Sequence, residues 1–243
     1  MRRIAVLVYG LGCYATFFST FLYACGFIGG FGVPKTIDSG AEAPLGSALL
    51  VNLALLSVFA VQHSGMARRG FKDTWTKIVP PVAERSTYVL ASSLLLIFLF
   101  WQWRPMPGVV WQVENATARL VLWALFAFGW GLVLVSTFLI NHFDLFGLRQ
   151  VYLYWRGQPY THLPFATPGP YRYVRHPLYV GWLFGFWATP TMTVGHLLFA
   201  AVTTSYILVA IVLEERDLAH YLGAPYEAYR QTVPKLIPFT RRG

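Results

Sequence analysis

Polar residues that could do chemistry stand at the two ends of one long apolar segment. Arg175-His176-Pro177 precedes Leu178–Leu213, and Glu214-Glu215 follows it directly. Glu214 therefore lies where an apolar helix leaves the membrane, and an unpaired carboxylate is costly at that boundary. The structural alternative is a solvated helix end, which we expect for Asp217 and Glu227. For Arg172, Arg175 and His176 the alternative is an anchor that contacts lipid phosphates.

A second group of polar residues lies at the ends of two other apolar segments. His142, Asp144 and Arg149 follow the fourth segment, and Gln62 and His63 stand near the end of the second. Imidazole and carboxylate groups can take up a proton, and an arginine can stabilise an anion. Two structural roles stay open. His142 and Asp144 could cap a helix or pair with Arg149, and Gln62 and His63 could hydrogen-bond between helices.

The composition indicates that these polar groups belong to an integral membrane protein. Of the 243 residues 56% are apolar and 12% charged, about half the charged share of a soluble domain. Disorder is excluded as well, because it needs low hydrophobicity. The charge-free segments are Ile4–Val33, Leu45–Ala67, Ser86–Trp103, Leu120–Asn141 and Leu178–Leu213. The last has 36 residues with Pro190 near its middle, and a span needs about 20, so we predict two helices there, over about 178–189 and 195–215.

The basic residues indicate how the chain is oriented. With the N-terminus inside, all of the 19 Lys and Arg residues except Lys35, Arg104 and Arg119 fall on the cytoplasmic side. We expect an aromatic belt at the outer ends from Trp101, Trp103, Trp111 and Trp123. The predicted fold is an all-α integral membrane protein with four transmembrane helices and a C-terminal helical hairpin, and both termini are cytoplasmic.

The cysteines, histidines and charge distribution argue against several other classes of protein. Cys13 and Cys25 share one apolar segment, which argues against a disulfide framework or a zinc module. The histidines lack the spacing of a helical metal pair, so we expect no metal, and the charge distribution fits a membrane surface better than nucleic acid. Prolines and glycines recur from Gly157 to Pro177, so this stretch is predicted to be a structured loop that leads into a helix at Pro177.

The ordered set of motifs in the last third of the chain resembles the isoprenylcysteine carboxyl methyltransferase and phospholipid methyltransferase superfamily. It consists of Arg175-His176-Pro177-x-Tyr179-x-Gly181, Glu214-Glu215, Gly223-x-x-Tyr226-x-x-Tyr229 and Val233-Pro234. The resemblance implies S-adenosylmethionine as cofactor, bound at the cytoplasmic face. It also implies the residues that line this cofactor: His162, Leu163, Tyr171, His176, Pro177, Leu178, Tyr179 and Glu214.

The implied roles are physically reasonable. Glu214 can bind the cofactor ammonium, Tyr171 and Tyr179 can stack on adenine or face the sulfonium, and His176 can bond to the carboxylate or ribose. The chain has no GxGxxG loop, which counts against a soluble Rossmann-type methyltransferase. We predict one membrane-embedded methyltransferase domain over 1–243, with helices in 1–141 and the cofactor loop, hairpin and C-terminal segment in 142–243.

The first two thirds of the chain are similar to the bacterial methanethiol S-methyltransferases, through Gln62-His63-Ser64-Gly65, Glu84-Arg85 and the stretch from Asn141 to Gln150. This similarity implies methyl transfer to a small thiol, methanethiol, which gives dimethyl sulfide. Ile207–Leu213 lacks the substrate-side arginine of the carboxyl methyltransferases, which disfavours a prenylcysteine carboxylate. That carboxylate, a lipid amine, and a non-enzymatic transporter or assembly factor stay open as alternatives.

A thiol must lose its proton before it attacks, because an alkyl thiol has a pKa of roughly 8.5. The expected catalytic residues are His142, Asp144 and His63 as bases, with Arg149 as the charge stabiliser. The expected partners are the thiol and membrane lipid, and the expected location is the bacterial inner membrane.

Overall fold

The computed structural model describes residues 1–240, which are mostly helical and form two compact units. Arg241 and Arg242, which we assigned to the cytoplasmic side, lie outside the described residues. The first unit comprises Met1–Gly108, His142–His162 and Thr193–His196, and the second comprises the rest of the described chain. Residues 142–162 thus group with the N-terminal helices. That the chain makes one domain stays a prediction.

Five helices of the described chain are long and apolar enough to span a membrane. They are α1 (Arg2–Gly29), α2 (Leu45–Ala67), α4 (Pro81–Gln102), α5 (Ala116–Ile140) and α9 (Val194–Leu222). Large apolar side chains on these helices are exposed, and Val61 on α2 keeps 74% of its surface. Exposed apolar surface on this scale needs lipid to cover it. The prediction of a multi-pass membrane protein is confirmed.

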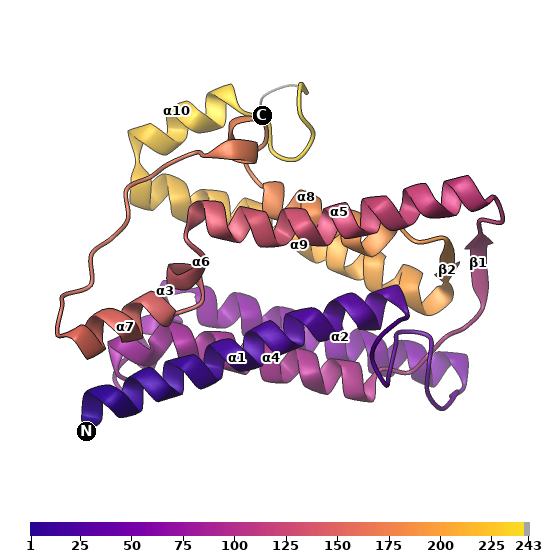
Figure 1. Cartoon of the computed structure of the whole chain (residues 1–243), viewed down its shortest axis with the longest axis horizontal. Coiled ribbons are helices and arrows are strands. Elements are labelled where there is room, and N and C mark those ends of the chain that lie inside the picture. The colour runs from indigo at the N-terminus through magenta and orange to yellow at the C-terminus, as the bar shows by residue number, and fades with distance from the viewer. Residues whose placement is uncertain (241–243) are drawn as a thin grey trace. The chain divides into compact units, whose positions relative to one another are not determined.

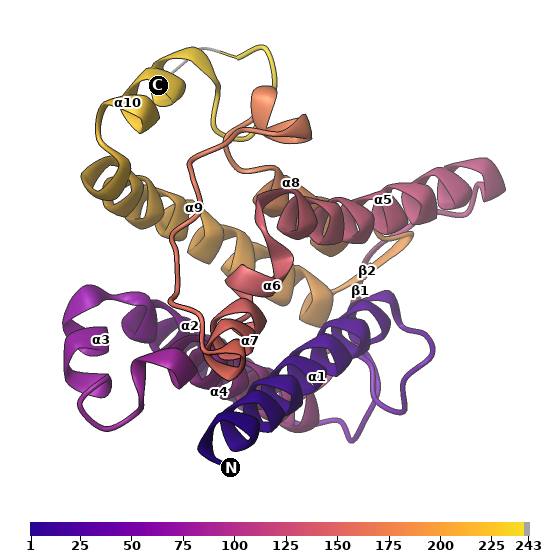
Figure 2. The same ribbon diagram turned by 60° about the vertical axis from the view of Figure 1, so that its left-hand side comes forward.

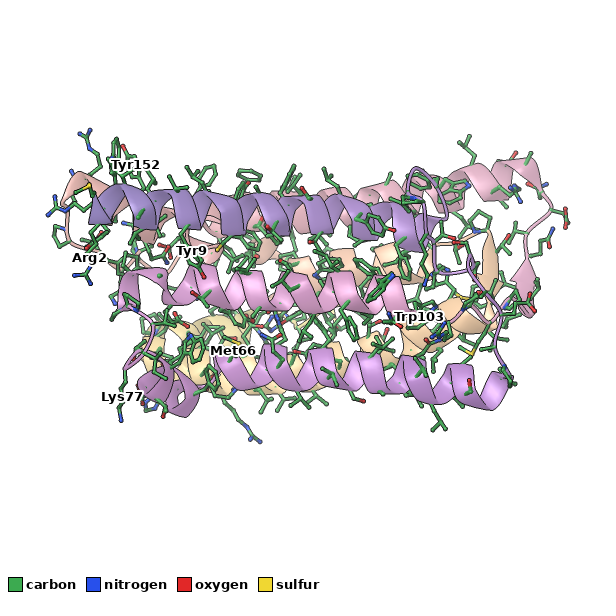
Figure 3. All side chains as sticks on the ribbon, turned by 90° about the horizontal axis from the view of Figure 1, so that it is seen from below. Arg2, Tyr9, Met66, Lys77, Trp103 and Tyr152 are labelled. Carbon is green, nitrogen blue, oxygen red and sulfur yellow. The ribbon has the colours of Figure 1, made fainter. Side chains whose placement is uncertain are left out.

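The first unit is built around α4, which packs against both α1 and α2. Figure 3 shows Arg2, Lys77 and Tyr152 at one end of these helices and Trp103 at the other. Three shorter helices, α3 (Arg69–Trp75), α6 (His142–Leu145) and α7 (Leu148–Arg156), complete the unit, and α7 packs against α1 and α4. Tyr9 on α1 is hydrogen-bonded to Thr87 on α4 at 2.9 Å.

Trp103 does not belong to an aromatic belt. Its side chain is fully buried, and its indole nitrogen donates a hydrogen bond to the Ile37 carbonyl at 3.1 Å. The expectation was wrong because closeness to the end of a helix does not tell whether a loop folds over the ring. Trp101 is exposed, as a belt residue would be.

The second unit contains most of the predicted hairpin, apart from residues 193–196. The helix α8 (Pro177–Trp187) is followed by a turn, by strand β2 (Thr191–Thr193) and by α9. Phe186 on α8 packs edge-to-face on Phe199 of α9, and Trp187 donates to Thr204 at 2.9 Å. With 11 residues, α8 is about 17 Å long, roughly half a bilayer core. The division of the last apolar segment into two helices is confirmed.

The chain also contains a small sheet that the all-α prediction missed. Strand β1 (Val109–Gln112) pairs with β2. Both strands are rich in β-branched residues, which favour extended backbone. They are three or four residues long, and such short runs between apolar helices do not carry a recognisable alternating pattern.

The helices α5 and α8 lie side by side because both have glycines at their contact (Figure 1). A Cβ on Gly129 of α5 would stand 2.7 Å from the Gly181 carbonyl oxygen and 2.7 Å from the Gly185 nitrogen. Gly181 and Gly185 are four residues apart on α8, the small-residue spacing that lets membrane helices approach closely.

We therefore expect Gly129→Ala to destabilise the protein, because its methyl group meets backbone atoms that cannot turn aside. Overpacking of this kind costs about 1–3 kcal/mol. The measurement is thermal unfolding in detergent. Gly131→Ala is the matched control, since nothing lies within 4 Å of a Cβ there. Equal melting temperatures for the two variants would contradict the close helix contact.

Two further elements complete the second unit. The 3-10 helix η1 (Gly169–Arg172) precedes α8, and α10 (Ala224–Thr232) follows α9. Gly223 adopts φ 62 between α9 and α10, a backbone conformation that glycine reaches easily. Figure 2 shows that α10 turns back from the C-terminal end of α9.

Candidate functional site

The segment before α8 is held by the C-terminal end of the described chain. The backbone nitrogens of Arg175 and His176 donate to the carbonyls of Pro234 and Lys235 at 2.8 and 3.1 Å. Pro177 is the first residue of α8, where its fixed φ suits helix initiation. The predicted helix start at Pro177 is confirmed.

Arg175 links three parts of the second unit. Its side chain is fully buried and donates from Nε to a Glu215 carboxylate oxygen at 2.8 Å. Its Nη1 donates to the Arg230 carbonyl at 2.7 Å and also to the Val233 carbonyl. The lipid-anchor alternative is therefore wrong for Arg175, because its charge is neutralised inside the protein.

Glu215 is the buried member of the carboxylate pair. The same carboxylate oxygen lies 3.0 Å from His176 Nε2, so one oxygen serves both an arginine and an imidazole. His176 is itself buried, which also removes it from the lipid surface. Neither Arg175 nor Glu215 was among the residues predicted from the sequence to bind the cofactor or to take part in catalysis. Their positions in the sequence could have identified them, because Arg175 is adjacent to His176 and Glu215 is adjacent to Glu214.

Glu214 has the opposite environment. Its side chain is 44% exposed. One carboxylate oxygen accepts a hydrogen bond from Tyr179 at 2.9 Å and lies 3.9 Å from His176 Nδ1. The structure thus brings three of the predicted cofactor residues together, and the carboxylate among them still has an accessible face.

Tyr171 lies near Glu214 and Tyr229 lies near Glu215, close enough for the carboxylates to act on their titration. Tyr171 donates to the Ser136 carbonyl at 3.5 Å, and Tyr229 donates to the Tyr171 carbonyl at 2.6 Å. Burial raises the pKa of Tyr171, and burial also raises the pKa of Tyr229 to about 12. Both hydroxyls therefore stay protonated at neutral pH and act as donors.

The other predicted cofactor residues are more dispersed. Leu178 is half-buried beside Pro177, whereas Leu163 is 40% exposed. His162 belongs to the first unit, where its ring packs edge-on against Tyr160.

An apolar groove of about 460 Å³ adjoins the start of α8 within the second unit. Pro177 lines it together with side chains from α5, η1 and the C-terminal segment. Its lining residues are Phe128, Leu132, Gly169, Pro170, Tyr173, Val174, Pro177, Val180, Leu236 and Pro238.

The first unit holds the residues predicted for thiol activation, in three separate places. His142 is buried, and its Nε2 lies 2.8 Å from the Tyr14 hydroxyl. The rings of Phe143 and Phe146 pack edge-on against it. Burial lowers the pKa of His142, so its imidazole is neutral at pH 7.

Asp144 and Arg149 form an ion pair at 3.1 Å, which is the structural role that the sequence left open for them. The second Asp144 oxygen accepts a hydrogen bond from Tyr160 at 3.1 Å. Arg149 also donates to the carbonyl and the hydroxyl of Thr161, at 2.7 and 2.8 Å. These bonds fasten residues 160 and 161 to α6 and α7.

His63 lies between α2 and α4. Its ring nitrogens lie 3.0 and 3.1 Å from the Tyr88 hydroxyl, and Nδ1 is 3.2 Å from Ser92. Ser92 also donates to Gln62 at 3.4 Å. The hydrogen bonding between helices that the sequence allowed for Gln62 and His63 is therefore present.

Within residues 1–240, no three His, Cys, Asp or Glu side chains gather closely enough to hold a metal ion. The expectation that the protein uses no metal stays a prediction.

Residues 151–220 match the isoprenylcysteine carboxyl methyltransferase (ICMT) family. The matched range includes the Arg175–Glu215 ion pair and Glu214. With the spanning helices and the methyltransferase relatives that match over the full length, it defines the class as an integral membrane methyltransferase, which sets aside the transporter and assembly-factor alternatives.

Similarity to known proteins extends over the whole chain. The methanethiol S-methyltransferase of Crocosphaera subtropica is 57% identical over 239 residues, 98% of this chain and 94% of that protein. The Mycobacterium tuberculosis methanethiol S-methyltransferase is 56% identical over 242 residues, 100% of this chain and 99% of that protein. This chain belongs to the methanethiol S-methyltransferase family. Nurim of Bos taurus is a more distant relative, 30% identical over 234 residues, 90% of this chain and 87% of that protein. No solved structure matches the chain.

Proposed function

We propose that this protein transfers the methyl group of S-adenosylmethionine to methanethiol and so forms dimethyl sulfide. The observation that carries the proposal is the identity of 56–57% to two methanethiol S-methyltransferases over nearly the full length. The identity extends over the N-terminal helices, which lie outside the ICMT match. These helices would be expected to diverge if the substrate were a prenylated carboxylate.

The residues around Glu214 fit this cofactor. S-Adenosylmethionine, when bound, supplies a methyl group on a cationic sulfur and carries an ammonium group besides. Glu214 is a carboxylate with an accessible face, and charge-assisted hydrogen bonds to such a group are strong. Tyr179 donates to Glu214, Tyr171 lies near enough for Glu214 to act on its titration, and His176 is held in place by Glu215. Leu178 and Pro177, with His162 and Leu163 from the preceding loop, complete the proposed cofactor residues.

The thiol must give up its proton, and His142 is the base that we propose. A neutral imidazole can accept a proton, and burial keeps His142 neutral at pH 7. Asp144 is less suitable because Arg149 and Tyr160 occupy its two oxygens. We assign Asp144 and Arg149 to positioning of the loop at Thr161, and His63 to the contact between α2 and α4.

In the proposed methyl transfer one bond forms and one bond breaks. The thiolate sulfur would form a bond to the methyl carbon as the bond from that carbon to the sulfonium broke, and both products, dimethyl sulfide and the demethylated donor, would be neutral thioethers. Opposite charges disappear in this step, so a dry site of low polarity favours it. A thiol as small as methanethiol gains little from burial, since each buried CH₂ contributes about 0.8 kcal/mol. We therefore expect saturation only in the millimolar range.

We also propose that both termini are cytoplasmic and that the protein lies in a bacterial inner membrane. The distribution of Lys and Arg supports this orientation. The contact of Arg175 with Glu215 places the two ends of the last apolar segment together, as a hairpin requires. A reporter fused after Gly243 that works only in the periplasm should be silent, and strong activity would refute the orientation.

Headspace gas chromatography tests the proposed reaction. Membranes that contain the protein are given S-adenosylmethionine with either methanethiol or a farnesylated cysteine. We expect dimethyl sulfide from the first substrate and no methylation of the second. His142→Ala should abolish dimethyl sulfide formation, whereas His220→Ala, a change at an exposed position, should not. Methylation of the farnesylated substrate without dimethyl sulfide would refute the thiol assignment.

A further inference from the structure

The hydroxyl of Tyr226 is an exception among the tyrosines around the glutamates. Tyr226 lies on α10 and is 2% exposed. Its Oη is buried and has no hydrogen-bond partner among the described residues. Tyr171 and Tyr229, in contrast, each donate to a carbonyl. A buried polar group without a partner is rare and calls for an explanation.

Tyr226 lies among aromatic rings and near the buried Arg175–Glu215 pair, and Glu214 is the proposed cofactor residue among the charged groups near it. Its ring centroid is 6.0 Å from that of Phe165 and 6.0 Å from that of Tyr229. Glu215, Arg175 and Glu214 are the charged groups near enough to affect its titration. Burial is the main reason that the pKa of Tyr226 is raised, so the hydroxyl is protonated at neutral pH. It is a hydrogen-bond donor that lacks an acceptor.

An acceptor brought by a ligand would remove this cost. An unsatisfied buried hydroxyl is destabilising, and part of this free-energy cost is regained when a ligand supplies the partner. Glu214 and Glu215 are acceptors, but neither bonds to Tyr226. A ligand group that satisfies Tyr226 must offer an oxygen or nitrogen lone pair, and Glu214, which we propose to bind a cation, is one of the charged groups near Tyr226.

We propose that Tyr226 binds the carboxylate at the amino-acid end of the methyl donor, through a hydrogen bond from Oη. This inference rests on the proposed function. In an amino acid the ammonium and the carboxylate are attached to the same carbon, so a carboxylate must lie beside any ammonium that Glu214 binds. Glu214 and Tyr226 then recognise the two charged groups of one ligand end, one as acceptor and one as donor.

The matched pair Tyr226→Phe and Tyr229→Phe tests the inference, because each variant removes one hydroxyl from α10. We expect Tyr226→Phe to weaken the binding of S-adenosylhomocysteine about fivefold, measured by calorimetry on the detergent-purified protein. Its melting temperature without ligand should stay the same or rise, since no bond within the protein is lost. Tyr229→Phe should melt at a lower temperature, because it loses the bond to Tyr171.

A second probe locates the acceptor. 5′-Methylthioadenosine has the nucleoside but lacks the ammonium and the carboxylate, so Tyr226→Phe should bind it as tightly as the wild type does. Equal loss for both probes would place the acceptor on the nucleoside and overturn the assignment. Unchanged binding of S-adenosylhomocysteine by Tyr226→Phe would also overturn it and leave water as the partner. If the wild type itself failed to bind S-adenosylhomocysteine, the proposed function would fall and the inference with it.

Discussion

Glu215→Ala should destabilise the protein more than any other single change considered for the second unit. It leaves the guanidinium of Arg175, which is fully buried, without its carboxylate. Removal of one partner of a buried ion pair costs about 3–5 kcal/mol. For a chain of this size the melting temperature should fall by about 10 °C. Thermal unfolding of the detergent-solubilised protein is the measurement.

Two controls separate the buried pair from ordinary surface charge. Glu227→Gln removes an exposed ion pair with Arg230 and should change stability by less than about 1 kcal/mol. The double variant Arg175→Met with Glu215→Leu replaces both charges by apolar groups, and it should be more stable than Glu215→Ala alone. A melting temperature of Glu215→Ala equal to that of the wild type would refute the structural role of the pair.

Glu214→Gln should act on cofactor binding and leave stability nearly unchanged. The glutamine keeps the shape of the side chain and an oxygen for Tyr179, but it loses the charge that we propose for the cofactor ammonium. Hydrogen bonds to charged groups contribute about 1.5–3 kcal/mol, which corresponds to a loss of roughly tenfold to a hundredfold in affinity. Calorimetry with S-adenosylhomocysteine measures this loss.

The neighbouring glutamates serve as controls for each other. Glu214→Gln should reduce the affinity for S-adenosylhomocysteine without changing the melting temperature. Glu215→Ala should act mainly by lowering the melting temperature. Glu227→Gln should change neither property. If Glu214→Gln bound S-adenosylhomocysteine as tightly as the wild type, Glu214 would not be a cofactor residue.

Most of the membrane architecture could be predicted from the sequence because its determinants are local. A run of about 20 apolar residues without charge is enough to define a helix that spans a bilayer. Pro190 interrupts the last run, and the structure has a turn and a strand there. Pro177 fixes the start of α8 in the same local way. These features depend on neighbours in the chain and require no knowledge of what packs against them.

The site was predictable only in part, since its residues are far apart in the sequence. His176, Tyr179 and Glu214 were all candidates, and the structure brings them together. Arg175 and Glu215 were not, although they are adjacent to the chosen residues. Asp144 and Arg149 were considered as catalytic residues or as an ion pair, and only the structure shows the ion pair and its contacts with Tyr160 and Thr161.

The sequence by itself determined that the chain is a multi-pass membrane protein with a break in its last apolar run, and it identified a pair of glutamates at the end of that run. Only the tertiary structure decided which glutamate is buried. Successive residues on a helix point about 100° apart, so Glu215 faces Arg175 while Glu214 remains accessible. Which side of α9 meets Arg175 depends on how distant segments pack, and a pattern of neighbouring residues does not contain that information.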